Sequence, residues 1–339
     1  MEIALIVEWL IKAVLMLAIL IVGFAYTTYM ERKTLARMQV RYGPNRAGPF
    51  GLLQPVADGV KLIFKEELIP AKADKLIFIL APMLTVIPAL VMLAVVPFGG
   101  TVNLFGQEIS LSIAGDINVG VLYITAIASI SVYGIVLAGW ASNNKYAMMG
   151  GIRSSAQMVS YELALGLAFI GPILLASSMS LEEIVQTQGR NIWFIILQPL
   201  GMIIFFLAAM AEINRSPFDM PEAEQELTAG YHTEYSGMKF ALFMMTEYIK
   251  VIVISVLFAT FFLGGYLGPF VDQVPWLGPL YIFIKTFILI FIIIWIRATM
   301  PRIRYDRLMA LGWKVLLPLA LLNVFLTGVL IIVFPNLIQ

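Results

Sequence analysis

Carboxylates gather in one polar segment of an otherwise apolar chain. The segment runs from Ala209 to Gly237, and its acids are Glu212, Asp219, Glu222, Glu224, Glu226 and Glu234. Ionisable groups at or just inside a bilayer edge cost free energy, and they usually serve proton or ion movement or hold a partner. Asp219, Pro221 and Glu222 also fit a capping box that opens a short helix, so a structural role explains those acids equally well. It explains Glu212 poorly, because Glu212 belongs to the preceding hydrophobic run.

Further ionisable residues lie inside long apolar runs. Glu162 sits about one turn inside one run, and Glu247 and Lys250 are three residues apart in another, a spacing that places them on the same helix face. A static hydrogen bond or ion pair is the structural alternative; we favour protonatable elements of a proton path. We assign Lys285, like Lys250, to the proton path. Lys285 stands alone in its run and needs a carboxylate from another helix, which Glu162, Glu212 or Glu247 could supply.

The segment after the first apolar run has a narrow polar stripe. Gln54, Asp58, Lys61 and Lys65 follow one another at i, i+4, i+7 and i+11, with apolar residues on the neighbouring faces. This pattern predicts an amphipathic helix lying in the membrane interface. It is either a plain surface anchor or the wall of a cavity mouth at membrane level, lined by Gln54, Asp58 and Lys61.

The composition predicts helices that cross a membrane. The 339 residues are 60% hydrophobic and 13% charged, and their mean hydropathy is +0.91, so we expect an all-α polytopic membrane protein with a single integral membrane domain, 1–339. A membrane span needs about 20 apolar residues. Eight runs reach that length: about 3 to 29, 76 to 97, 118 to 140, 156 to 177, 192 to 212, 239 to 267, 278 to 297 and 314 to 335.

The positive charges predict the orientation. Eight spans put both termini on one side, and the loops on that side carry only Arg190 among the Lys and Arg residues assigned to loops. The positive-inside rule then places both termini outside and the acidic segment in the cytoplasm. Near the C-terminus, Arg297, Arg302, Arg304 and Arg307 are either topology determinants or a docking site for an acidic peripheral subunit.

Several kinds of chemistry are excluded. The chain has no cysteine, so it can hold neither an iron–sulfur cluster nor a thiolate zinc site, and its only histidine, His232, argues against a metal site. No dinucleotide or nucleoside triphosphate motif is present. Any redox cofactor therefore has to sit on other subunits.

Four loop motifs identify a known family. ERKTLARMQVRYGPNRAGPFGLLQPVADGVKLIFKE, GWASNNKYAMMGGIRSSAQMVSYE, AEINRSPFDMPEAEQELTAGYHTEYSGMKF and MPRIRYDRLMALGWK resemble, in order and spacing, the H subunit of the proton-translocating NADH-quinone oxidoreductase, respiratory complex I, which is called subunit 1 in mitochondria. The similarity covers nearly the whole chain, and the motifs are specific.

The resemblance implies a membrane-arm subunit that forms the quinone-binding chamber with two subunits of the peripheral arm. The quinone tail would enter between the first and sixth helices and the amphipathic segment. The implied chamber residues are Arg32, Arg41, Arg46, Gln54, Asp58 and Lys61, with Phe218 and the run from Glu222 to Glu226 as the floor. The implied proton path consists of Glu162, Glu212, Glu222, Glu224, Glu226 and Glu247. Where some relatives have an acid in the third helix, this chain has none, so the path would use Ser129, Tyr133 or water.

The resemblance also implies the setting. Quinone is the substrate, no cofactor is bound covalently, and iron–sulfur clusters and flavin belong to partner subunits of the peripheral arm. The chain would lie in a bacterial inner membrane, where it contacts lipid and other membrane-arm subunits. No nucleic-acid partner is implied. One rival is the homologous subunit of a membrane-bound hydrogenase-type complex. Another is a stand-alone ion transporter, against which stands the absence of a repeat between the two halves.

Overall fold

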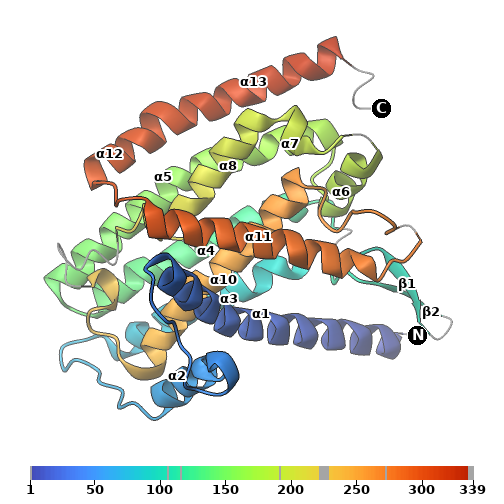
Figure 1. Ribbon diagram of the computed structural model, residues 1–339. Helices are drawn as coiled ribbons and strands as arrows, with labels where there is room; N and C mark the ends of the chain where they lie inside the picture. The colour runs from blue at the N-terminus through green and yellow to red at the C-terminus, as the bar shows by residue number, and fades with distance from the viewer. Residues whose placement is uncertain are drawn as a thin grey trace.

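The computed structural model describes residues 2–104, 107–114, 117–190, 192–220, 229–271 and 273–334. Within these ranges the chain is a bundle of helices with a small β-hairpin at one end (Figure 1). The hairpin pairs β1 (Thr101–Leu104) with β2 (Gln107–Ser110) in antiparallel fashion. The prediction of an all-helical polytopic membrane protein is confirmed.

Seven helices in the described part of the chain are long and apolar enough to cross a membrane. They are α1 (Glu2–Met38), α3 (Lys75–Val91) with its 3-10 extension η2 (Met92–Val95), α4 (Gly120–Ala141), α5 (Lys145–Ala176), α10 (Gly237–Phe262), α11 (Leu277–Thr299), and the C-terminal helix formed by α12 (Tyr305–Ala310), a π-helical turn (Leu311–Leu316) and α13 (Leu317–Val333).

The remaining predicted run, 192 to 212, is divided. It forms α7 (Phe194–Leu197) and α8 (Pro199–Glu212), separated at Gln198. The break has a local cause, because the proline at the first position of α8 has no backbone N–H to continue the helical hydrogen bonds of α7. Of the about eight predicted spans, the described residues therefore contain seven long helices and this shorter, broken one.

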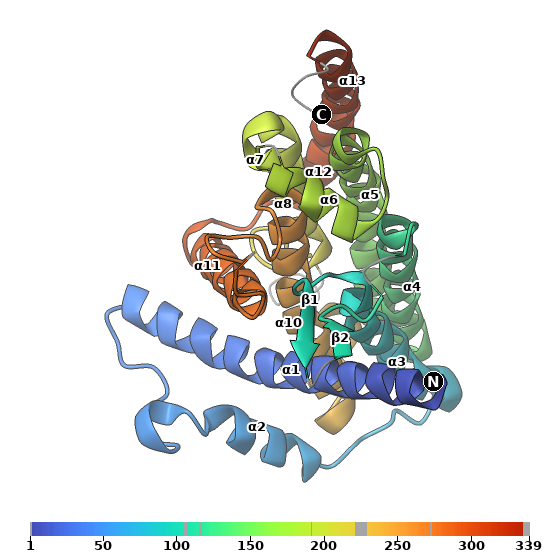
Figure 2. The same cartoon turned by 90° about the vertical axis from the view of Figure 1, so that its right-hand side faces the viewer.

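The core of the bundle surrounds α10. Figure 2 shows α10 between α11 on one side and α4 on the other, and α10 also packs against α1 and α3. Phe205 of α8 contacts Phe258, Phe261 and Phe262 of α10 and Phe169 of α5 through tilted and edge-to-face rings. Such aromatic pairs add about 0.5–1.5 kcal/mol each beyond the burial of their area, so α5, α8 and α10 form one rigid unit.

The shorter helices lie at the ends and margins of this bundle. They are η1 (Pro49–Gly51), α2 (Gln54–Ile63), α6 (Leu181–Arg190) and η3 (Gly230–His232). α2 lies beside the C-terminal part of α1 and has no buried residue (Figures 1 and 2). Its apolar residues Val56, Val60 and Ile63 are exposed. α1 is also peripheral, because only 6% of its most apolar stretch is buried.

Two glycines let backbone segments approach closely. A Cβ atom on Gly134 of α4 would lie 2.9 Å from the carbonyl oxygen of Ala81 in α3. A Cβ on Gly150 of α5 would lie 2.6 Å from the Cα of Gly230. Only glycine fits at such separations, so Gly150 allows the loop that contains η3 to pack directly on α5.

Candidate functional site

A polar cluster joins α2 to α1. Asp58 Oδ2 lies 2.5 Å from Arg32 Nη1, while its Oδ1 accepts a hydrogen bond from Gln54 Nε2 at 3.2 Å and lies 3.5 Å from Lys61 Nζ. We call these four residues the Asp58 cluster. Partial burial acts to raise the pKa of Asp58, but the hydrogen bonds and charges of its neighbours, chiefly Arg32, outweigh it and hold the pKa below its usual range. Asp58 is therefore ionised, and its contact with Arg32 holds α2 against α1.

The other predicted chamber residues lie apart from this cluster. Arg41 donates to Gln39 Oε1 at 2.7 Å, and Arg46 is exposed. Phe218 is only 3% exposed, and its ring packs against that of Tyr161, so it belongs to the core of this chain. The predicted site residues Glu222, Glu224 and Glu226 lie outside the described residues.

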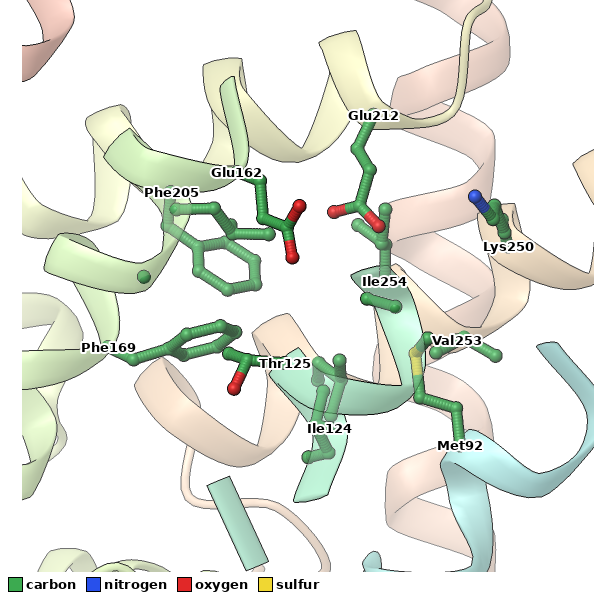
Figure 3. A pocket seen from close by; sticks show the side chains of 14 residues that line it. Met92, Ile124, Thr125, Glu162, Phe169, Phe205, Glu212, Lys250, Val253 and Ile254 are labelled. Atoms are coloured by element: carbon green, nitrogen blue, oxygen red, sulfur yellow. The ribbon is translucent and has the colours of Figure 1, made fainter. Parts of the chain in front are cut away.

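Two carboxylates face each other inside the bundle. Figure 3 shows Glu162 of α5 and Glu212 of α8 pointing toward one another, with Lys250 of α10 beyond Glu212. All three line one cavity, which α4 also helps to enclose through Thr125. The space open to water centres is about 20 Å³, above the roughly 10–15 Å³ that one water molecule needs. The cavity therefore has room for about one water molecule beside the two carboxylates.

The end of α8 is held in place by a buried amide. Gln157 Nε2 donates to the backbone oxygen of Ala211 at 2.8 Å and to that of Phe218 at 2.7 Å. Gln157 belongs to α5, five residues before Glu162, so α5 positions both carboxylates. The last carbonyls of a helix have no partner inside the helix, and this side chain satisfies one of them.

Hydroxyl groups of α4 complete the surroundings of the acids. Ser129 donates a hydrogen bond to Glu162, and Ser131 accepts one from Lys250 Nζ at 2.9 Å. Tyr133, the other hydroxyl residue suggested by the sequence, is 66% exposed. Of the residues considered for the acid-free third helix, the structure brings Ser129 to the carboxylates and leaves Tyr133 on the surface.

A second cavity continues from Lys250 and Glu212 to Glu247. We call Glu162, Glu212, Lys250 and Glu247 the buried row. Sequence spacing predicts that Glu247 and Lys250 share a helix face, and both are indeed buried on α10. Their hydrogen-bond and ion contacts differ, however, because Lys250 donates to Ser131 whereas Glu247 Oε2 lies 3.1 Å from Arg215 Nη2.

Arginines extend the buried row toward α1. Arg215 Nη1 lies 3.6 Å from Glu31 Oε2, and Glu31 also pairs with Arg297 of α11. The guanidinium of Arg215 also stacks over the ring of Tyr248, 4.1 Å from its centroid. We call Glu247, Arg215, Glu31 and Arg297 the arginine network. It connects α10, the loop after α8, α1 and α11 by charge.

Sequence reasoning missed most of this network. Arg297 is predicted above to set topology or dock a partner, yet it pairs with Glu31 inside this chain. The available signal was charge complementarity at the membrane edge, since Glu31 follows the first apolar run and Arg297 ends the seventh. His232, considered only as a metal ligand, has its Nε2 3.7 Å from Glu247 Oε1.

Lys285 does not meet the predicted carboxylate. Its Nζ donates to the backbone oxygens of Leu263, Gly265 and Leu267, each at 2.7 Å, and lies over the ring of Trp193. The prediction of a partner among Glu162, Glu212 and Glu247 is therefore wrong. The turn after α10 leaves carbonyl groups without helical partners, and a lysine with three donors satisfies them.

Comparison with known proteins settles the family. The family model described as NADH dehydrogenase matches residues 11–328. The chain belongs to the NADH dehydrogenase family. Among its relatives, the NADH-quinone oxidoreductase H subunit of Thermomicrobium roseum and the H subunit numbered 2 of Geobacter metallireducens are 54% and 51% identical, each over 96% of both chains. The H subunit numbered 2 of Syntrophobacter fumaroxidans is 54% identical over 94% of both chains.

Membership of the NADH dehydrogenase family confirms the resemblance predicted from the four loop motifs. The match spans the Asp58 cluster, the buried row and the arginine network, because all of these residues lie between 11 and 328. The whole candidate site therefore lies within the matched region.

Proposed function

We propose that this chain is the membrane subunit that couples quinone reduction to proton translocation in a proton-pumping NADH-quinone oxidoreductase. Its relatives are named as the H subunit of NADH-quinone oxidoreductase and match it along nearly their full length. The chain is not catalytic alone, because it has no cysteine to hold an iron–sulfur cluster and must receive electrons from partners. The observation that carries the proposal is the pair of carboxylates, Glu162 and Glu212, that face each other across an internal cavity.

The Asp58 cluster supports a quinone entrance between α1 and α2. The polar side of α2 turns toward Arg32 of α1, while the apolar residues of α2 are exposed. An apolar outer face suits the membrane interface, and an isoprenoid tail could pass from lipid along such a wall. Arg41, Arg46, Phe218 and the acidic run from Glu222 to Glu226 complete the proposed chamber together with peripheral-arm subunits.

The buried row is suited to carry protons away from that chamber. Reduction of a quinone takes up two electrons and two protons, and a reduced, anionic quinone shifts the protonation of nearby carboxylates by charge proximity. Groups this close titrate as a coupled set. Protonation changes at Glu247 would therefore propagate through Glu212 to Glu162, with water in the two cavities as the bridge. Glu222, Glu224 and Glu226 would lie on the chamber side of this path.

Lys285 has no part in the proposed path, because its donors are taken by backbone carbonyls at the end of α10.

The proposed setting is the bacterial inner membrane, with the peripheral arm on the cytoplasmic side. The first turn of α1 and the last turn of α13 lie at the same end of the bundle (Figure 1), which agrees with an orientation that puts both termini outside. The proposed partners are the iron–sulfur and quinone-site subunits of the peripheral arm and the other subunits of the membrane arm.

The test uses the intact complex reconstituted into vesicles. Glu212→Gln and Glu162→Gln remove one titratable proton each and preserve size, so we expect proton pumping and coupled quinone reduction to fall together. Glu183→Gln, in the exposed first turn of α6, is the control and should leave both unchanged. Normal pumping in both row variants would overturn the proposal, as would isolation of the chain with a hydrogenase and no quinone dependence.

A further inference from the structure

His232 is a buried histidine that the proposed path does not use. It lies in η3, in the loop between α8 and α10, and is only 3% exposed. The rings of Tyr231, Phe240 and Phe243 surround it. Glu247 is ten residues inside α10, about 15 Å from the start of that helix by its rise per residue. The loop therefore folds back into the bundle, which brings the imidazole to the carboxylate.

The contacts of the ring fix where its first proton lies. Nδ1 is 3.2 Å from the backbone oxygen of Ala229. A carbonyl oxygen can only accept, so Nδ1 must carry a hydrogen, and Nε2 is left as the atom that gains or loses a proton. Nε2 faces Glu247 Oε1 at 3.7 Å. Burial lowers the pKa of His232 to about 3, which favours the neutral ring with a lone pair on Nε2.

At 3.7 Å these two atoms are beyond hydrogen-bond distance, but a lone pair facing an ionised carboxylate in a buried site is repulsive, so the pair is more stable when it holds one proton. The carboxylate of Glu247 divides its contacts accordingly, because Oε2 is the oxygen nearest Arg215 Nη2 and Oε1 is the one turned to the imidazole. Among the described residues, the other charged groups near the pair are Glu31, which contacts Arg215, and Glu212 and Lys250, which line the same cavity as Glu247.

We propose that His232 is a proton-relay residue that exchanges one proton with Glu247 when the 3.7 Å gap between Nε2 and Oε1 closes to hydrogen-bond distance. Transfer in one direction breaks the Oε1–H bond and forms an Nε2–H bond, giving imidazolium and carboxylate, and no electron changes hands. Once Glu247 passes its proton along the buried row, the pair holds none and takes up another from water on the chamber side. That proton first binds Nε2, giving imidazolium, and then moves to Oε1 of Glu247. His232 thus restores the proton on Glu247, the first member of the row. This inference rests on the proposed function of the row.

The key variant is His232→Asn in the intact complex. Asparagine keeps an N–H that can reach the oxygen of Ala229 but removes the atom that faces Glu247. We expect the rate of proton pumping to fall by about tenfold or more, together with the rate of coupled quinone reduction, and the pH profile of pumping to change shape. Thr233→Val is the matched control. Thr233 is exposed and its hydroxyl supports the same turn through Gly230, so a merely structural effect would appear there as well.

A second measurement does not depend on any histidine variant. Infrared difference spectra of the complex are recorded during quinone reduction. The band of Glu247 is assigned as the one that disappears in Glu247→Gln. We expect this band to be that of a protonated carboxyl before reduction. A band of ionised carboxylate at neutral pH would overturn the relay, as would wild-type pumping and pH profile in His232→Asn. If Glu212→Gln and Glu162→Gln also pump normally, the proposed function itself fails; if only His232→Asn does, the relay alone fails.

Discussion

Ser129 of α4 donates a hydrogen bond to the carboxylate of Glu162 on α5. This contact places a proton-exchanging hydroxyl beside an acid, on a helix that supplies no acid of its own. It also connects the buried row to α4. Ser129 on α4 and Glu162 on α5 are both half-buried.

Removal of this hydroxyl should weaken pumping. A positioned proton-exchanging group speeds proton transfer, so we expect Ser129→Ala to lower the pumping rate by about tenfold or more, measured in vesicles with a pH-sensitive dye. Tyr133→Phe removes an exposed hydroxyl from the same helix and should have no effect. Equal rates in Ser129→Ala and wild type would show that Glu162 works without this partner.

The arginine network should govern stability. Arg215→Met removes one of the two arginines that contact the buried Glu31, together with the guanidinium that contacts Glu247, and breaking a buried pair costs about 3–5 kcal/mol. We expect a lower midpoint of thermal unfolding and less assembled complex. Arg190→Met, at an exposed position, should change the free energy of unfolding by no more than about 0.5 kcal/mol. Unfolding of both variants at the same temperature would contradict the structural role of the network.

The Asp58 cluster should open in acid. Because the folded-state pKa of Asp58 is lowered, its contribution is present above the unfolded pKa near 3.8 and is lost as pH falls through the folded value. Arg32 is half-exposed, so solvent screening limits the contribution to about 0.5 kcal/mol. Hydrogen-exchange protection of 54–63, corrected for intrinsic rates, should decline below about pH 4. Asp58→Asn should show the lower protection already at pH 7 and no further decline in acid.

Gly150 should not tolerate a methyl group. In Gly150→Ala the Cβ would meet the backbone of Gly230 at 2.6 Å, and overpacking of this kind costs about 1–3 kcal/mol. The displaced loop carries His232, so pumping should fall with stability. Gly166→Ala lies in the same helix with nothing within 4 Å of its Cβ and should be neutral or stabilising, by up to about 1 kcal/mol. Unfolding midpoints of the two purified variants give the comparison.

Lys285 should matter for folding and not for pumping. Lys285→Met leaves three carbonyls near the end of α10 without their donor, so we expect a loss of about 2–3 kcal/mol in the free energy of unfolding. The ratio of protons pumped to quinone reduced should stay at the wild-type value in the complexes that assemble. A lower ratio in a variant of normal stability would return Lys285 to the proton path.

Local patterns predicted the helices well. A run of about 20 apolar residues is a one-dimensional signal, and α1, α3, α4, α5, α10 and α11 lie where such runs do. The run at 192 to 212 failed in detail because Pro199 stops the hydrogen-bond pattern without changing the hydropathy. The mean hydropathy of the run is unaffected by such a break, whereas the helical hydrogen bonds of the backbone are interrupted.

The pairing of charges was harder to predict than their presence. Glu162, Glu212 and Glu247 stood out because acids are rare in apolar runs, and the structure places them along two connected cavities. Arg215 and Arg297 looked like loop charges, since their partners are far away in sequence. Lys285 donates to backbone carbonyl groups. Every residue has such a group, so no pattern of side chains could have revealed these partners.

The pairing of Glu31 with Arg297 spans 266 residues of sequence, and this has a consequence for how the protein is made. The ribosome delivers α1 with its acid long before it delivers Arg215 or the end of α11. Until then Glu31 has neither arginine, and α1, with so little of its apolar surface covered by other helices, has lipid as its main neighbour. Closure of the arginine network that joins α1, α10 and α11 is therefore a late event in biogenesis, because it needs nearly the whole chain.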